Sequence, residues 1–322
     1  MNNPWEEIER PVSDLFYRLI DAEHPLRLLR ARDSYDRFLF IYEFQGSGKA
    51  VEKIPELNGI DINLHQPKGL QAENHKMILV LRDKRDWQIF LSLCNDIVSS
   101  TRSSAPGIQA TQVILRRLRQ WQKFLQKIQK DLLSEISIKG LIGELLFITR
   151  HLFPAFGAGA AIQFWQGPED APQDFNIHDC AVEVKCQTGN TSPRVHISSI
   201  DQLCPQLPKM YLYVVTLGRV EDNNFNAVNL PALIQTIREK LEIDSPMDLE
   251  RFNNLIYQEG YLDLEEYEHF NYMLVSERMY LVSDGFPRVC QEELPLGVVG
   301  INYDINLINC EPFAAFPKWV NL

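Results

Sequence analysis

The chain has 322 residues, with 32 lysines and arginines against 43 aspartates and glutamates, which gives a formal net charge of −11. This balance excludes a protein that holds nucleic acid by bulk positive charge, so any anion-binding surface must be local. The length fits about two domains, and no apolar run approaches the ~18 residues needed to span a bilayer. Because no signal or transit pattern is visible, we expect a cytoplasmic protein with no membrane partner. None of the six cysteines is spaced as C-x-x-C, so we expect neither a structural zinc site nor a disulfide framework.

The N-terminal third has the pattern of a β-rich region that follows a short helical lead-in over residues 1–30. Apolar or alternating runs predict strands over residues 38–44, 59–64 and 77–81, and a helix over 86–97. Residues 99–107 are small and polar and contain proline and glycine, which is typical of a linker. We therefore expect an N-terminal β-rich domain, 1–105, whose role no motif indicates, and a second domain, 106–322.

An amphipathic helix follows the linker over about residues 114–132. Apolar residues recur at alternating steps of four and three, at Ile114, Leu118, Trp121, Leu125, Ile128 and Leu132. Basic residues lie between them, at Arg116, Arg117, Arg119, Lys123, Lys127 and Lys130. The helix either packs against a core with a solvated basic face or uses that face to follow nucleic-acid phosphates, and the two interpretations are compatible.

The rest of the chain alternates between helical and strand patterns. Helices are predicted over 137–153, from a capping-box pattern at Ser199, and over 230–241; strands are predicted over 161–165, 174–177, 181–186, 210–217, 280–283 and 296–303. Residues 221–270 hold 12 acidic and three basic residues and have a helical pattern. We expect an α/β (α+β) fold with a mixed central sheet flanked by helices, an N-terminal β-rich region and a helical acidic C-terminal segment.

The side chains that suit catalysis or metal binding lie in two successive predicted strands. Asp174 heads the first strand, and the second carries Glu183 and Lys185, which share one face because side chains alternate along a strand. If the two strands form a hairpin, Asp174 lies next to Glu183. Two close carboxylates repel unless a proton or a cation joins them, and Mg²⁺ prefers such oxygen ligands. With a lysine beside the metal, this set suits hydrolysis of a phosphodiester, although an ordinary surface ion pair has the same pattern.

The predicted helix 137–153 supplies a third acid. Glu144 is the only acidic residue between Ser137 and Phe153, and Gly140 and Gly143 lie in the helix interior. Interior glycines cost about 1 kcal/mol each relative to alanine, so they often mark a close approach to another element. Glu144 is either a solvated surface residue or a third carboxylate aimed at Asp174 and Glu183.

This order of helix and strands, with its acids and lysine, resembles the PD-(D/E)XK nuclease superfamily. Gly143-Glu144 resembles the first-helix acid, Gln173-Asp174 the Pro-Asp position with Pro172 one residue early, and Glu183-Val184-Lys185 matches (D/E)-x-K in full. Four stretches, 142–145, 174–175, 182–185 and 196–203, also resemble a bacterial family known only as PD-(D/E)XK motif proteins. Members of that family tend to be encoded beside restriction and phage-defence genes, and the motif core here covers about residues 137–217.

The resemblance implies a restriction-endonuclease-like core and a DNA endonuclease that depends on Mg²⁺, with Mn²⁺ as a substitute. By position, Glu144, Asp174, Glu183 and the backbone carbonyl of Val184 would hold the metal, and Lys185 would position the attacking water. Gln187, on the same strand face, would contact a phosphate or water. The resemblance also allows two further partners, other defence proteins and a second copy of the chain.

A polar stretch, 189–196, and the predicted helix after it suggest a place for the DNA backbone. A helix N-terminus with nearby hydroxyls suits a phosphate, so we name Arg194, His196, Ser198 and Ser199 as nucleic-acid contacts; an ordinary capped helix is the plainer interpretation. Two alternatives to a nuclease stay open. The chain is either a catalytically silent subunit that binds nucleic acid or scaffolds a defence complex, or an interaction protein with a surface ion-pair cluster.

Overall fold

The computed structural model describes residues 2–45, 54–65, 75–127, 133–169, 171–189, 192–221 and 227–320. The chain forms two compact units, Met1–Asp131 with Leu262–Glu265, and Leu132–Tyr261 with Glu266–Leu322. The boundary expected near residue 105 lies inside the first unit, which therefore contains the basic helix that the sequence assigns to the second domain. None of the helices in the described ranges is long and apolar enough to cross a membrane.

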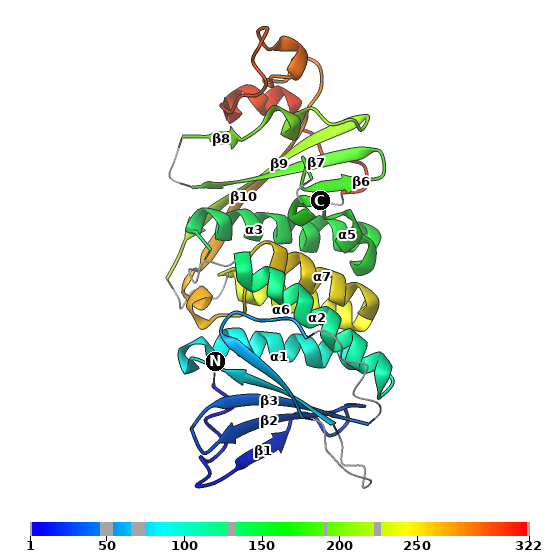
Figure 1. Ribbon diagram of the computed structural model, residues 1–322. Coiled ribbons are helices and arrows are strands. Elements are labelled where there is room, and N and C mark those ends of the chain that lie inside the picture. The colour runs from blue at the N-terminus through cyan, green and yellow to red at the C-terminus, as the bar shows by residue number, and fades with distance from the viewer. Residues whose placement is uncertain are drawn as a thin grey trace. The chain divides into compact units, whose positions relative to one another are not determined.

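The first unit is built on a five-stranded antiparallel sheet (Figure 1). Its strands, in spatial order, are β1 (Leu15–Leu19), β2 (Arg27–Asp33), β3 (Phe38–Phe44), β5 (His75–Leu81) and β4 (Ile60–His65). The three strands predicted from sequence are confirmed, but the helical lead-in over residues 1–30 is wrong because β1 and β2 form there. Leu29 and Ala31 of β2 point to one face, where they pack with Leu39 and Ile41 of β3, and this period of two suits a strand.

Two helices, α1 (Trp87–Thr101) and α2 (Ile108–Lys127), belong to the same unit. Arg117, which the sequence places among the basic residues of α2, is 1% exposed and binds both carboxylate oxygens of Asp96 on α1, at 2.8 and 2.5 Å. Trp121 Nε1 donates to the same carboxylate at 2.8 Å. Arg116, Arg119 and Lys123 are exposed, whereas residues 128–132 and the Lys127 side chain lie outside the described part. Arg117 is therefore a buried link between two helices and cannot belong to a phosphate-binding face.

Replacing Arg117 tests this buried pair. Arg117→Met leaves the Asp96 carboxylate buried without its cation, and we expect the free energy of unfolding to fall by about 3 kcal/mol. The matched control is Arg119→Met on the exposed face of α2, which should change stability little. Calorimetric unfolding of the full chain measures both, and equal effects of the two variants would contradict the assignment.

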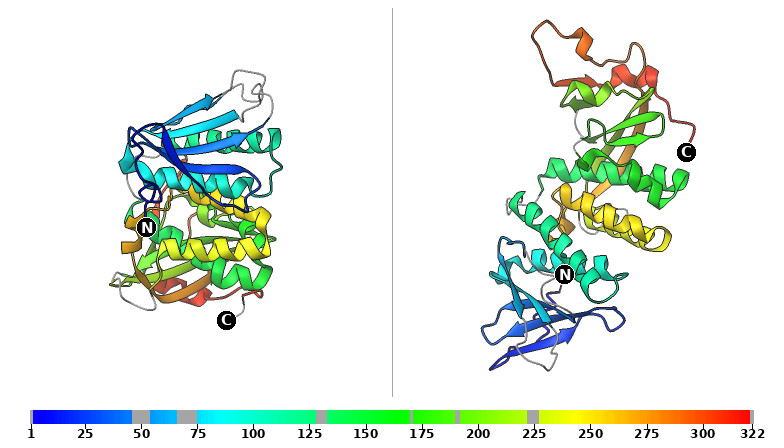
Figure 2. Two further views of the ribbon diagram at one scale, coloured as in Figure 1. Left: turned by 90° about the horizontal axis from the view of Figure 1, so that it is seen from below. Right: turned by 45° about the vertical axis from the view of Figure 1, so that its right-hand side comes forward.

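The second unit has a mixed four-stranded sheet with layers on both faces (Figures 1 and 2). Its spatial order is β10 (Tyr272–Leu281), β9 (Lys209–Arg219), β7 (Cys180–Thr188) and β6 (Phe175–Ile177). The β6–β7 and β9–β10 pairs are antiparallel, and β7 and β9 are parallel. With a mixed sheet and flanking helices, the predicted α+β class is confirmed.

One face of this sheet packs against α3 (Glu135–Phe147). Phe147 of α3 contacts Phe175 and Tyr213, with ring centroids 4.9 Å apart in both cases. The opposite face forms an apolar core with β8 (Arg194–Ile197), β11 (Tyr303–Asn306) and the 3-10 segment η8 (Leu307–Phe313). Since β11 begins at residue 303, the strand expected over 296–303 is wrong for nearly all of its length.

Helices α4 (Phe153–Phe156) and α5 (Ala158–Phe164) follow α3 after a π-helical turn, Ile148–Leu152. The strand expected over 161–165 is therefore wrong. Ala158, Ala161 and Ile162 are buried on one side of α5, and a short apolar run does not distinguish a buried strand from a buried helix. In the acidic segment 221–270, most of the described residues are helical as predicted, in α6 (Leu230–Asp244) and α7 (Pro246–Gln258), and residues 222–226 lie outside the described ranges. Cys204 and Cys290 form a disulfide, against our expectation for the cysteines.

Glu277 of β10 ties the π-helical turn after α3 to the sheet. It accepts hydrogen bonds from Arg150 at 2.7 Å and from the Tyr213 hydroxyl at 2.7 Å, and His151 Nε2 lies 3.3 Å away. These contacts hold the pKa of the Glu277 carboxyl well below its usual range, and the hydrogen bond with His151 has the largest effect. The charged carboxylate thus anchors the π-helical turn that follows α3, the helix that carries Glu144.

We expect Glu277→Gln to lower the free energy of unfolding by about 2 kcal/mol at neutral pH, since hydrogen bonds to a charged group are lost. A carboxyl whose pKa is lower in the folded than in the unfolded state stabilises the fold. This contribution is complete above the unfolded-state pKa, about 4.3, and is lost as the pH falls below that value. The difference between wild type and variant should therefore shrink below about pH 4. Denaturant unfolding across pH, with the exposed Glu292→Gln as control, checks this, and a constant difference would refute it.

Candidate metal and phosphodiester site

The β6–β7 hairpin brings Asp174 and Glu183 together, as the sequence predicts. Phe175 pairs with Val182, so the residues just beyond that pair, Asp174 and Glu183, lie at the open end of the hairpin. Asp174 Oδ2 accepts the Val184 N–H at 2.7 Å, and the Asp174 carbonyl accepts the N–H groups of Gln166 and Gly167 at 2.8 and 3.1 Å. The Asp174 backbone and one of its carboxylate oxygens are therefore fixed by the surrounding main chain.

Glu183 is a buried carboxylate with one oxygen unsatisfied. The residue is 2% exposed, and its Oε1 lies 2.8 Å from Lys185 Nζ. Its Oε2 is buried with no hydrogen-bond partner among the described residues. A buried polar atom without a partner is costly, so this oxygen marks a position that suits a cation or a proton.

Glu144 reaches the same place from α3. Its Oε2 accepts the Trp165 Nε1–H at 2.6 Å. A Cβ atom on Gly167 would lie 3.0 Å from Asp174 Oδ1 and 3.3 Å from Glu144 Oε2, so the two carboxylates border one small space that any side chain here would fill. Gly143 lets α3 approach β7 closely, since a Cβ there would lie 3.3 Å from Val184 Cγ1. The close approach expected from the interior glycines holds at Gly143, whereas a Cβ on Gly140 would meet nothing within 4 Å.

The surroundings of the three carboxyl groups disfavour the charged form of each. Burial raises the pKa of Asp174 to about 6 against the opposing effects of the Val184 N–H and Lys185. Burial and then the charge of Asp174 raise the pKa of Glu183 to about 8. Burial, followed by the charge of Asp174, also raises the pKa of Glu144 well above its usual range. Lys185 offsets part of this negative charge, and a further cation would offset more.

The donor set suits a hard divalent cation, although no three His, Cys, Asp or Glu side chains in the described part of the chain are arranged as a ready-made metal cage. Mg²⁺ needs no such cage, because it keeps several waters and binds through one or two carboxylates. The unsatisfied Glu183 Oε2 and the Asp174 oxygen that Val184 does not occupy supply such donors. The residues present therefore fit the metal that the sequence pattern implies.

Gln187 lies farther along β7 and contacts the neighbouring strand. Its Nε2 donates to the Thr216 hydroxyl of β9 at 3.0 Å, and its Oε1 is buried with no partner among the described residues. The Val184 main chain lies against Asp174 through its N–H. Metal ligation by the Val184 carbonyl and a phosphate or water contact of Gln187 stay predictions.

The four predicted nucleic-acid contacts lie around β8. Arg194 and His196 are exposed on that strand, and both face Asp304 of β11, at 3.7 and 2.8 Å. Ser198 and Ser199 precede a 3-10 turn, η5 (Ile200–Leu203), and Ser199 makes no side-chain cap hydrogen bond. The helix N-terminus expected there is therefore wrong, since four residues of 3-10 helix replace it; residues 190–191 of the preceding polar stretch lie outside the described ranges.

Three residues that shape the site carry no signal that marked them in the sequence. Trp165 ends a predicted strand, Gln202 belongs to the capping-box pattern that begins at Ser199, and no pattern marks Gly167. Trp165 instead donates to Glu144, Gly167 leaves room between two carboxylates, and Gln202 accepts a hydrogen bond from Lys185 at 3.1 Å. Only their spatial neighbours reveal these roles.

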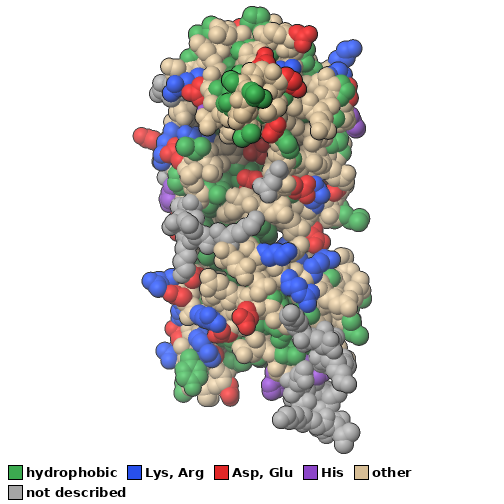
Figure 3. All heavy atoms as spheres, turned by 45° about the horizontal axis from the view of Figure 1, so that its top comes forward, with side chains coloured by type: hydrophobic (Ala, Val, Ile, Leu, Met, Phe, Trp, Pro, Cys, Tyr) green, Lys and Arg blue, Asp and Glu red, His purple; other side chains and the backbone are tan. Residues whose placement is uncertain are grey.

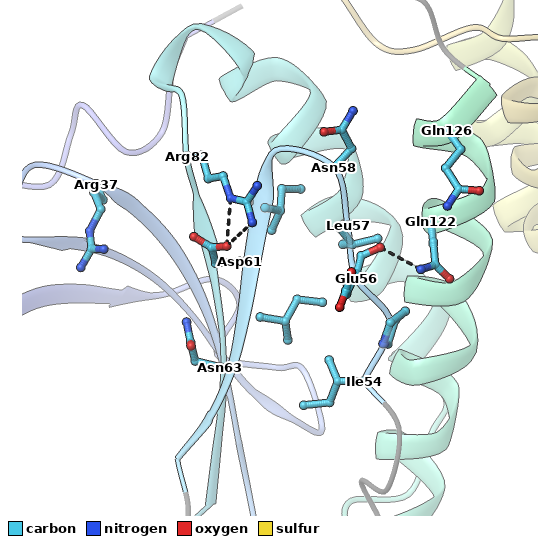
Figure 4. Close-up of a pocket in the computed structure, with 13 residues that line it drawn as sticks. Arg37, Ile54, Glu56, Leu57, Asn58, Asp61, Asn63, Arg82, Gln122 and Gln126 are labelled. Carbon is cyan, nitrogen blue, oxygen red and sulfur yellow. Dashed lines mark hydrogen bonds and ion pairs between the residues drawn. The ribbon is translucent and has the colours of Figure 1, made fainter.

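A separate polar hollow of about 870 Å³ lies in the first unit (Figure 4). Its walls come from β4 and the residues before it, from Arg37 and Arg82, and from Gln122 and Gln126 of α2. Arg82 spans one side of it and binds Asp61, with Nε 2.9 Å from Oδ1, and Gln122 donates to the Glu56 carbonyl at 2.9 Å. None of the predicted site residues lines this hollow, so it does not belong to the carboxylate site.

A family model described as "Putative PD-(D/E)XK family member, (DUF4420)" matches residues 1–308. No curated protein and no solved structure matches the chain. The matched range includes the α3 acid, the hairpin and Lys185, and it confirms the family resemblance seen in the sequence. The chain therefore belongs to this PD-(D/E)XK family.

Proposed function

We propose that the chain is a nuclease that hydrolyses phosphodiester bonds in DNA with the help of Mg²⁺, for which Mn²⁺ can substitute. One observation carries the proposal: Glu183 Oε2 is buried without a partner, beside Asp174 and Lys185. Family membership supports it, because a PD-(D/E)XK family fits a nuclease. On the resemblance to defence-associated proteins alone, we extend the proposal to a role in restriction or phage defence.

The proposed roles follow from position. Asp174, Glu183, Glu144 and the Val184 carbonyl would hold the cation, which would lower the pKa of a water and offset charge on the phosphate. Lys185 orients the attacking water or a phosphate oxygen, and Gln187 contacts the same groups. The DNA backbone is held by a second set of residues, Arg194, His196, Ser198 and Ser199. Arg194, His196 and Ser198 are exposed on or just after β8 and Ser199 is half-buried, so a phosphate can reach this group.

Cleavage of a DNA substrate with Mg²⁺ or Mn²⁺ tests the assignment. We expect Asp174→Ala, Glu183→Ala and Lys185→Ala each to reduce the cleavage rate by at least about 100-fold, since the first two remove proposed ligands of the cation and the third removes the positive charge beside the phosphate. Asp179→Ala is the matched control, because it removes an exposed carboxylate from the turn of the same hairpin, where it pairs with Lys209 at 2.6 Å. Wild-type rates in all three site variants would sink the proposal.

Thermal unfolding with added metal gives an independent test of the cation site. Saturating Mg²⁺ or Mn²⁺, at about 100 times the dissociation constant, should stabilise the wild type by about 2.7 kcal/mol. Asp174→Asn keeps an oxygen that accepts the Val184 N–H but removes the charge, so the metal-free variant should stay folded and lose the metal-induced shift. Absence of metal binding to the wild type, with DNA binding retained in a gel-shift assay, would instead favour a catalytically silent nucleic-acid-binding subunit.

A further inference from the structure

We infer that Gln202 is a positioning residue that fixes the Lys185 ammonium at the proposed nuclease site; the role in catalysis, though not the contact itself, rests on the proposed function. Lys185 Nζ lies 2.8 Å from Glu183 Oε1 and 3.1 Å from Gln202 Oε1. A lysine ammonium has three N–H donors. Two of them are thus held by acceptors from different elements, which leaves the third for a water or a phosphate oxygen.

The orientation of the Gln202 amide is determined by its neighbours. The same Oε1 that accepts from Lys185 also accepts the Ser198 N–H at 2.9 Å. If the amide were turned over, its NH₂ group would face two donors, which is unfavourable. The oxygen therefore faces Lys185, and Gln202 acts as a fixed acceptor for the ammonium.

The segment that carries Gln202 is anchored at both ends. Before Gln202, the Asp201 carbonyl accepts from the Gln173 amide, next to Asp174. After it, the Leu203 carbonyl accepts from Arg288 Nη1 at 2.8 Å, and the adjoining Cys204 is joined to Cys290 by the disulfide. Ile200 and Leu203 are buried. An acceptor on so constrained a turn limits the rotamers of a long, flexible lysine side chain, which is the condition for a precisely placed charge.

The test compares Gln202→Leu, Gln202→Glu and the matched control Gln206→Leu, an exposed residue that follows the same turn. Leucine removes the acceptor at similar size, whereas glutamate keeps an oxygen for both the Lys185 ammonium and the Ser198 N–H. The first readout needs no activity: trace acetylation of the full chain with acetic anhydride, with the modification of Lys185 quantified by peptide mass spectrometry. The second is the steady-state cleavage of DNA.

We expect Gln202→Leu to raise Lys185 acetylation several-fold and to lower kcat by roughly 10- to 100-fold, with KM changed by less than about 2-fold. Gln202→Glu should keep acetylation at the wild-type level and recover most of kcat, and Gln206→Leu should match wild type in both. Unchanged acetylation or unchanged kcat in a folded Gln202→Leu variant would overturn the inference. If the wild type cleaves no DNA, the proposed nuclease function fails, and acetylation alone still decides whether Gln202 holds Lys185.

Discussion

The second unit is organised around a set of carboxylates that cannot all be charged without help. Burial raises the pKa of Asp174, Glu183 and Glu144, and the charge of Asp174 raises the pKa of the two glutamates further. Repulsion of this kind would open a loosely packed site. Here the Val184 N–H, the Trp165 indole and the Lys185 ammonium hold one oxygen of each acid, so the negative charge stays concentrated where a cation can enter.

The sheet makes this concentration possible because both of its faces are covered. Alternation along β7 directs Val184 toward α3 and sends Glu183 and Lys185 to the opposite face, where the core around Leu212 and Val214 also lies. Glu144 approaches from the helix layer, while Gln202 approaches Lys185 from the layer that holds β8 and the disulfide-linked turn. The acids and the lysine are therefore fixed from two sides by elements that share no local sequence.

The sequence was informative where a local rule decides the structure. The spacing of Glu183 and Lys185, the hairpin that brings Asp174 beside Glu183, and the close approach at Gly143 all follow from strand periodicity or from side-chain size. Prediction failed where tertiary contacts decide. Residues 158–164 are as apolar as a strand but form a helix, and β2 forms where a helix was expected because its alternating leucine and alanine meet β3. The contacts of Trp165 and Gln202 join distant segments, so no local pattern could reveal them.

The charge of −11 bears on how the proposed substrate would approach. On the face shown in Figure 3, lysine and arginine side chains lie interspersed with acidic ones, so no broad basic surface is visible there. Arg117, part of the most basic stretch of sequence, is buried against Asp96, which reduces that surface further. A phosphate would thus meet a site with its own excess of carboxylates and gain little from long-range attraction. Under the proposed function, Asp174 and Glu183 would hold a cation, whose charge would offset part of theirs beside the phosphate.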